Sequence, residues 1–305
     1  MSSMKTRSNK KYHFNQISAG SNAVINFVFL INTIICLAPL LLIVIISFTN
    51  SDWVMKNGYS FFPQKLSLSA YGFILSSASM IFRAYGVSIF VTVVGTVISL
   101  LIIAMFAYPL SRRSFDYRNV FSFIVFFTMI FGGGLIPWVM IYRHVVPIYN
   151  TLAVLILPYL INGWFVIIMR TFMKSTIPEE VIESARIDGA GELRTFFVIV
   201  LPLCKAGLAT IGLFAMLNYW NDWYLPLIFI TNPKLVNIQY MLYKIMSSIE
   251  FLKSANGNGA NAIKNIPTET VRMAIAVLAI GPIIFAYPFF QNYFIKGLTI
   301  GAVKG

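Results

Sequence analysis

Long apolar runs without charge recur along the chain. Five of them occupy residues 23–48, 84–111, 119–142, 145–169 and 273–295. Each is longer than the roughly 20 residues that an α-helix needs to cross the hydrocarbon core of a bilayer. A sixth run begins at Ala206 and contains one charged residue, Asp222, before Lys234. The pattern predicts an all-α polytopic membrane protein with six spans, because barrel strands would alternate apolar and polar positions.

The runs divide the chain into a regular series of segments. The first apolar run exceeds the roughly 7–15 residues of a secretory signal core, and no small-residue cleavage site follows it, so we expect it to remain as the first span. The expected segments are an N-terminal tail 1–22, a first span 23–48, an external loop 49–83, a core 84–295 with spans 84–110, 119–142, 147–169, 206–230 and 272–295, an inner loop 170–205 and an external loop 231–271, and a C-terminal tail 296–305.

Composition supports lipid as the main solvent of this chain. Hydrophobic residues make up 58% of it and charged residues 11%, whereas soluble domains average about 25% charged. The basic residues then give the orientation. Of the 23 Lys and Arg, 14 fall on the side that holds both termini, so this side is expected to be cytoplasmic in a bacterial cytoplasmic membrane.

The net charge of +13 has two possible explanations, namely contact with anionic lipid and contact with nucleic acid. Positive-inside bias and lipid headgroups account for it, and no basic-aromatic nucleic-acid module is visible. The two Cys and two His are scattered, which predicts neither a disulfide nor a metal site.

Glycine and proline interrupt the third run at Gly132, Gly133, Gly134 and Pro137. Such a cluster breaks or bends a helix. Within a membrane the freed carbonyl groups need protein or water around them. The segment therefore either lines a cavity or packs closely against another helix through small residues. Both alternatives stay open.

The external loop 231–271 contains a stripe of apolar residues at helical spacing, with charged residues on the other face. This predicts an amphipathic helix that either lies on the membrane or docks an external protein. The stripe consists of Ile238, Leu242, Ile245, Ile249 and Leu252.

Five of the ten acidic residues fall within residues 178–202, here called the acidic segment. Thr176 and Glu179 have capping-box spacing around Pro178, which predicts a helix start. Gly189 is expected to end that helix in a left-handed turn, and a second helix is expected from Glu192. Small Ala185 would let another surface approach closely. A short helix, a tight turn and a second helix beneath the membrane suit insertion into a groove of a soluble partner.

The acidic segment resembles the cytoplasmic loop of permease subunits of binding-protein-dependent ABC importers. The matching elements are Glu183-Ser184-Ala185, Gly189, Ile199 and Leu201-Pro202, all at the expected spacing, with Ser184 in place of Ala. The stretch ARIDGAGELRTFF, including Asp188, is similar to the carbohydrate-uptake branch. The stretch LNYWNDWYLPLIFI and the ending YFIKGLTIGAVKG resemble the MalG-like permease of maltose and multiple-sugar importers, and FGGGLIP is similar to a sub-branch for uronic-acid-rich oligosaccharides.

The resemblance implies a type I ABC importer permease fold and a set of partners. These are a homologous second permease, two ATPase subunits, an extracytoplasmic solute-binding protein, an oligosaccharide and membrane lipid, with no nucleic acid. The residues implied in ATPase coupling are Glu183, Ser184, Ala185, Asp188, Gly189, Leu201 and Pro202. No cofactor is expected in this chain, and it is not expected to be an enzyme. ATP and Mg would bind the partner subunits, because no GxxxxGK[ST] loop occurs here.

The polar and aromatic residues of the fifth span are candidates for the substrate pathway, because aromatic faces stack on sugar C–H surfaces and amides bond hydroxyls. They are Asn218, Tyr219, Trp220, Asn221, Asp222 and Trp223. An Asp near a helix end also serves as an interfacial anchor, and this alternative stays open. The C-terminal tail Gly297–Gly305 either reaches the ATPase interface or is unstructured. Rival functions are an ABC permease for peptide, polyamine or phosphate, a secondary transporter, and an intramembrane enzyme, for which no motif is present.

Overall fold

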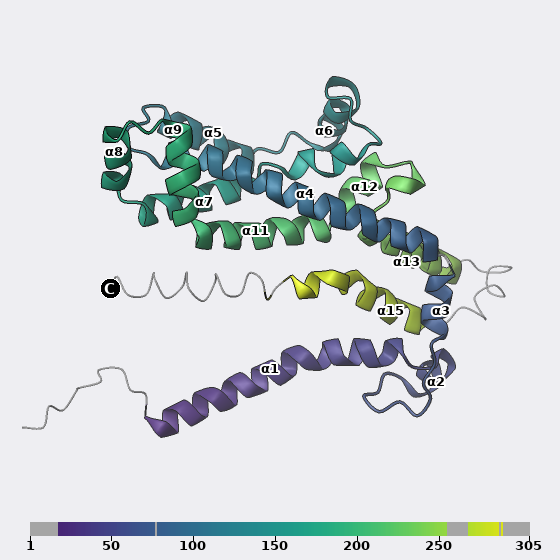
Figure 1. Ribbon diagram of the computed structural model, residues 1–305. Helices are drawn as coiled ribbons and strands as arrows, with labels where there is room; N and C mark the ends of the chain where they lie inside the picture. The colour runs from purple at the N-terminus through teal and green to yellow at the C-terminus, as the bar shows by residue number, and fades with distance from the viewer. Residues whose placement is uncertain (1–17, 77, 255–267, 287, 289–305) are drawn as a thin grey trace, which may run out of the picture.

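Helices build almost all of the structure. The computed structural model describes residues 18–76, 78–254, 268–286 and 288 (Figure 1). Within these ranges the extended backbone amounts to one isolated bridge between Thr49 and Leu66. The N-terminal basic cluster, the C-terminal tail and the end of the last expected span lie outside the described residues.

The α-helices are α1 (Ala19–Ser47), α2 (Ser51–Asn57), α3 (Ser69–Leu75), α4 (Ala78–Ser111), α5 (Arg118–Ile130), α6 (Leu135–Met140), α7 (Gly163–Thr176), α8 (Glu179–Ile187), α9 (Glu192–Arg194), α10 (Leu201–Leu203), α11 (Lys205–Trp220), α12 (Tyr224–Phe229), α13 (Ile238–Ser254) and α15 (Thr268–Ile280). Shorter 3-10 turns are η2 (Leu152–Leu155), η3 (Leu157–Tyr159), η5 (Pro233–Leu235) and η6 (Gly281–Phe285). Wider π-helical turns are η1 (Ile141–Val145) and η4 (Thr195–Val200).

Three helices of the described residues are long and apolar enough to cross a membrane, namely α1, α4 and α15 with η6. Three further helix pairs pass the same test together but bend sharply, so the number rises to six if each pair forms one span. The bends are 112° between α5 and the α6–η1 unit, 51° between η2–η3 and α7, and 82° between α9–α10 and α11. The first two pairs fall mainly on expected spans. The third joins α9–α10, which lie in the expected inner loop 170–205, to α11 in the expected fifth span.

The breaks follow the helix-breaking residues. The chain is non-helical from Phe131 to Gly134, where the glycine cluster predicted an interruption. The fourth apolar run forms only short 3-10 turns before Gly163, and its helix α7 continues to Thr176, into the expected inner loop. The α7 helix stops there because residue 177 precedes Pro178, and the residue before a proline is disfavoured in the α conformation.

Helix α4 is the central helix of the bundle. It packs on α11 and α7, and α7 packs on α5. Close approach of α4 to α11 depends on Gly95, because a Cβ there would lie 2.7 Å from Cζ of Tyr219. Small residues at helix crossings are the common means of packing inside membranes. Helix α15 lies between α1 and the α4–α11 layer (Figure 1).

The two ends of α4 carry different structures. Helices α8 and α9 lie at the end near Ser111, and α2, α3 and α13 lie at the opposite end (Figure 1). Each end has its own buried apolar cluster. We call them the α8 end and the α13 end.

Helix α13 has the expected amphipathic pattern, but its apolar stripe is already occupied. Ile238, Leu242 and Ile249 are buried, and the helix packs against α4, α15 and α12. Ile245 packs at the edge of the same cluster, and the side chain of Leu252 lies outside the described part. The stripe therefore faces this chain's own bundle and is free for neither lipid nor an external protein.

Candidate functional site

The acidic segment forms a short helix at the α8 end. Helix α8 begins at Glu179, and Pro178 is its N-cap with an extended backbone. The expected capping box is wrong: Thr176 is the last residue of α7, and the N-cap makes no side-chain hydrogen bond. Glu179 and Glu180 lie in the first turn, where carboxylates stabilise the positive end of the helix dipole.

The predicted turn at Gly189 is confirmed. Gly189 has φ +77°, a left-handed conformation that glycine adopts without steric cost. Its N–H donates to the carbonyl of Arg186 at 3.0 Å, and the N–H of Ala190 donates to the carbonyl of Ala185 at 2.9 Å. This pair of bonds is a Schellman motif, which satisfies the last carbonyls of a helix. Helix α9 then begins at Glu192, as expected.

The residues implied in coupling differ in where they point. Glu183, Ser184, Asp188, Gly189 and Pro202 are exposed, and Leu201 is half-buried. Ala185 is instead buried, on the same inward face as Ile182. The surface that closely approaches Ala185 is therefore this chain's own bundle. Within the described residues the Glu183 carboxylate has no hydrogen bond or ion pair, so it is available to another molecule.

Two apolar side chains beside the turn were missed by sequence reasoning. Ile187 is 86% exposed at the end of α8, and Leu193 is 67% exposed in α9. Helix α8, the Gly189 turn and α9 together form a short polar unit, residues 179–194, here called the α8 knuckle. Large apolar side chains exposed on such a polar unit are typical of a contact surface. Their positions within the two predicted helices gave no signal, because their exposure depends on the geometry of the turn between those helices.

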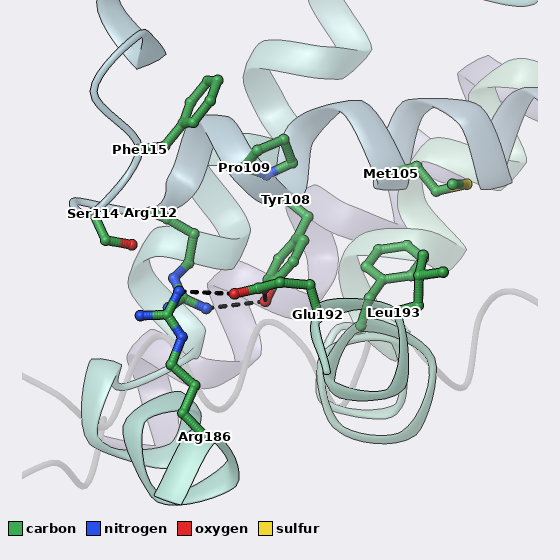
Figure 2. A pocket seen from close by; sticks show the side chains of 10 residues that line it. Met105, Tyr108, Pro109, Arg112, Ser114, Phe115, Arg186, Glu192 and Leu193 are labelled. Atoms are coloured by element: carbon green, nitrogen blue, oxygen red, sulfur yellow. Dashed lines mark hydrogen bonds and ion pairs between the residues drawn. The ribbon is translucent and has the colours of Figure 1, made fainter. Parts of the chain in front are cut away.

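A polar network ties this knuckle to α4. Arg186 Nη2 donates to Glu192 Oε1 at 2.8 Å, and the Tyr108 hydroxyl donates to Glu192 Oε2 at 2.8 Å (Figure 2). Arg112 Nη1 donates in turn to the Tyr108 hydroxyl at 2.9 Å. These side chains line a cavity of about 420 Å³ whose other walls are apolar apart from Ser114. On the other side of α8, Arg113 Nε lies 3.5 Å from Glu179 Oε1.

The network favours a charged Glu192. Its pKa is lowered, first by the hydrogen bond from Arg186 and second by the bond from Tyr108. Hydrogen bonds and nearby positive charge both favour the carboxylate over the acid. A lowered pKa in the folded state means that this stabilisation is present at neutral pH and is lost only as the pH falls through that lowered value.

The substrate-pathway candidates are only partly brought together. Asn218, Asn221, Asp222 and Trp223 line a cavity of about 460 Å³ beside the α11–α12 junction. Tyr219 and Trp220 belong to the core. The Tyr219 hydroxyl donates to the carbonyl of Ile156, and Trp220 Nε1 donates to the carbonyl of Ala279, both at 3.0 Å. These two residues hold helices together and do not face the cavity.

Asp222 acts as a local anchor. It is 8% exposed, and its Oδ1 accepts from the backbone N–H groups of Tyr224 and Leu225 at 3.0 and 3.1 Å. The Tyr159 hydroxyl donates to the same oxygen at 3.3 Å. Asp222 thus starts α12 and positions both Tyr159 and Tyr224.

Three further residues with polar groups line this cavity, and the sequence reasoning did not assign them to it: Tyr159, Asn162 and Tyr224. Asn162 is a polar residue in an apolar run, and this polarity could have marked it as a candidate cavity residue. Tyr159 lies 63 residues from Asp222, so only the folded structure brings them together.

The described residues hold no group of three or more His, Cys, Asp or Glu arranged for a metal ion. Cys36 is exposed and Cys204 is buried, and both are free thiols.

Known proteins of similar sequence are sugar permeases. No protein-family model matches the chain. The chain is 36% identical over 275 residues to the polygalacturonan/rhamnogalacturonan transport system permease protein YtcP of Bacillus subtilis (strain 168), covering 89% of this chain and 94% of that protein. It is 30% identical over 274 residues to the arabinooligosaccharides transport system permease protein AraQ of Halalkalibacterium halodurans, covering 89% and 92%.

The fold is similar to that of a solved importer subunit. A chain in the crystal structure of a bacterial ABC transporter involved in the import of the acidic polysaccharide alginate matches with a TM-score of 0.76 and 31% identity. The match covers 92% of this chain and 99% of the other.

These likenesses define the class of protein. The chain belongs to the permease subunits of sugar ABC transporters, and it is a multi-pass protein of the bacterial cytoplasmic membrane. The resemblance in the acidic segment is thereby confirmed at the level of the family. The secondary-transporter and intramembrane-enzyme alternatives are set aside, because the matches span nearly the whole chain.

Proposed function

We propose that this chain is the MalG-like permease subunit of an importer for oligosaccharides released from uronic-acid-rich polysaccharides. The observation that carries the proposal is similarity at 36% and 31% identity, over about nine-tenths of the chain, to permeases named for polygalacturonan/rhamnogalacturonan and alginate transport. Substrate would arrive on an extracytoplasmic binding protein. A homologous permease would complete the pathway.

In this proposal the chain crosses the membrane six times, and α9–α10 of the third bent pair belong to the cytoplasmic loop that precedes the fifth span. The α8 end, the N-terminus and the C-terminus face the cytoplasm, because the basic residues gather on that side. The α13 end faces the exterior, where the binding protein docks.

Helix α8 would insert into a cleft of one ATPase subunit. The free carboxylate of Glu183 would pair there with a basic residue, in a charge-assisted bond that is stronger when sheltered from water. The exposed side chains of Ile187 and Leu193 would supply apolar contact beside that pair. When ATP and Mg close the two ATPase subunits, the knuckle moves with them. The Arg186–Glu192–Tyr108 links carry that movement into α4.

The cavity beside α11 and α12 would form this subunit's part of the sugar pathway. Asn218 and Asn221 supply amide groups for sugar hydroxyls, and Trp223 supplies an aromatic face. Binding sites for small polar ligands combine aromatic walls with a few placed polar groups in this manner.

Uptake by the whole importer tests the function. The chain, its partner permease and the two ATPase subunits are reconstituted in proteoliposomes, with the cognate binding protein outside and ATP inside. Uptake of oligogalacturonides or oligoalginates that stops without ATP supports the proposal. ATP-dependent uptake of a peptide, a polyamine or phosphate in place of any sugar contradicts it. A thermal-shift screen of the binding protein identifies the sugar independently.

A further inference from the structure

A second cavity adjoins the sugar-pathway cavity and shares two of its walls. It has a volume of about 610 Å³ and is bounded by Gly132–Gly134 and by Trp138 of α6. Tyr159 and Tyr224 line both cavities. Each cavity lies in the usual size range of ligand pockets, about 300–1,000 Å³. We call them the amide compartment (lined by Asn162, Asn218 and Asn221) and the glycine compartment.

The main chain is open to ligand in the glycine compartment. Gly132, Gly133 and Gly134 are exposed, and in the described part of the chain their N–H groups have no hydrogen-bond partner. A Cβ at Gly132 or Gly133 would meet no atom within 4 Å. Close packing inside this chain therefore does not require glycine here.

Peptide N–H groups without a hydrogen-bond partner need a polar neighbour when they lie within an apolar run. Irregular backbone at membrane depth is tolerated only where it is buried in protein or lines a water-filled cavity. The 112° break between α5 and α6 exposes these groups toward the cavity instead of closing the helix over them.

Aromatic rings and the apolar side chains of Leu135, Pro137 and Ile141 form the remaining wall. The rings of Trp138 and Tyr224 stack with centroids 6.4 Å apart and planes 15° apart. Tyr224 and Tyr159 are in turn positioned by Asp222, through its bonds to the Tyr224 N–H and the Tyr159 hydroxyl. Sugar rings have apolar C–H faces and polar hydroxyl edges. A ring-lined compartment with free peptide groups is complementary to both.

The geometry points to a two-compartment groove in which the first two sugars of an oligosaccharide occupy the amide compartment and the following sugars occupy the glycine compartment, with their hydroxyls bound to the Gly132–Gly134 main chain. The inference rests on the proposed function. It gives the glycine cluster a role in the selection of substrate by chain length. Short oligosaccharides use the amide compartment alone, and longer ones require both compartments.

The test uses the complete reconstituted importer. Uptake is measured with ladders of two to six sugars made from pectin, alginate and arabinan, with products separated by mass spectrometry. Gly133→Leu adds a bulky side chain to the wall of the glycine compartment, at a position that lacks the left-handed backbone conformation of Gly134. Gly86→Leu is the matched control, because Gly86 is also exposed with no atom within 4 Å of a Cβ, but lies in α4 away from both compartments.

The expected result is a change of length preference. Gly133→Leu lowers uptake of tetramers and longer chains at least tenfold relative to dimers, and Gly86→Leu retains the wild-type profile. An unchanged profile in Gly133→Leu overturns the inference alone. An equal loss at all lengths also overturns it, and assigns the glycines to packing against the partner permease. No uptake of any ladder by the wild-type importer overturns the proposed function itself.

Discussion

The hydroxyl of Tyr108 donates a 2.8 Å hydrogen bond to Oε2 of Glu192, and this bond joins the end of α4 to the helix that follows the α8 knuckle. Arg186 in α8 holds the other oxygen of the same carboxylate. One side chain thus connects the exposed knuckle with the longest helix of the bundle. In an importer, movement of the knuckle would reach the membrane through this connection.

Tyr108→Phe tests the connection directly. A hydrogen bond to a charged group contributes about 1.5–3 kcal/mol, and about 1.4 kcal/mol corresponds to a factor of ten, so we expect coupled transport to fall about tenfold or more while the protein stays folded. The measurement is sugar imported per ATP hydrolysed in proteoliposomes. Tyr117→Phe is the control, because Tyr117 is 64% exposed and its hydroxyl has no partner within the described residues. Equal coupling in both variants would show that Tyr108 does not transmit movement from the α8 knuckle to α4.

Glu183→Lys is expected to weaken binding of the ATPase subunit, because it places a positive charge where the partner presents a basic residue. Glu180→Lys makes the same charge change one turn earlier, at a carboxylate that is also exposed. That control costs the helix start about 0.3–1 kcal/mol, and so it is the harsher change for α8 itself. Copurification of the ATPase subunit is measured for both. Greater loss in Glu180→Lys than in Glu183→Lys would argue against pairing at Glu183.

Gly189→Pro is expected to abolish transport without preventing membrane insertion. Proline fixes φ near −65° and has no N–H, whereas Gly189 has φ +77° and donates to Arg186. Gly189→Ala is a milder change, with a cost of about 1 kcal/mol for the left-handed conformation. Gly191→Ala provides the control, since Gly191 has φ −69° and no atom near its Cβ position. Uptake and surface labelling are compared, and normal uptake by Gly189→Pro would refute the role of the turn.

Asn218→Ala and Tyr219→Phe distinguish a residue that lines the sugar pathway from a residue that stabilises the helix core. Asn218 is exposed in the amide compartment, so its loss is expected to raise the sugar concentration needed for half-maximal uptake without lowering thermal stability. Tyr219 is 2% exposed, and removing its bond to Ile156 is expected to destabilise the bundle by about 1 kcal/mol with unchanged sugar affinity. Thermal unfolding in detergent and uptake curves measure both. The reverse pattern would contradict the assignment.

Local rules predicted the features that depend on neighbouring residues. The uncharged runs predicted the apolar helices, because span length follows from bilayer thickness. The Gly189 turn and the start of α9 at Glu192 were also predicted, since only a few residues determine a helix end. The glycine break at residues 131–134 follows from the same rules.

Contacts between distant segments could not be predicted in this way. Tyr108 and Glu192 are 84 residues apart, and Tyr159 and Asp222 are 63 apart, so no local pattern links them. The inward face of Ala185 and the burial of Tyr219 and Trp220 depend on how α8 and α11 rotate against α4. The fourth run was predicted as one span because its apolar character is continuous, yet its first half forms short 3-10 turns.

Cysteine crosslinking at Ile187 tests the central claim, that α8 contacts an ATPase subunit at the cytoplasmic face. Ile187→Cys is made with Cys36→Ser, since Cys36 is exposed and Cys204 is buried. Met55→Cys in α2, also exposed, marks the opposite end. We predict that position 187 crosslinks to the copurifying ATPase subunit and resists a membrane-impermeant maleimide in intact cells, whereas position 55 shows the opposite behaviour. Labelling of position 187 from outside, or no crosslink to any ATPase subunit in the assembled complex, would contradict the account.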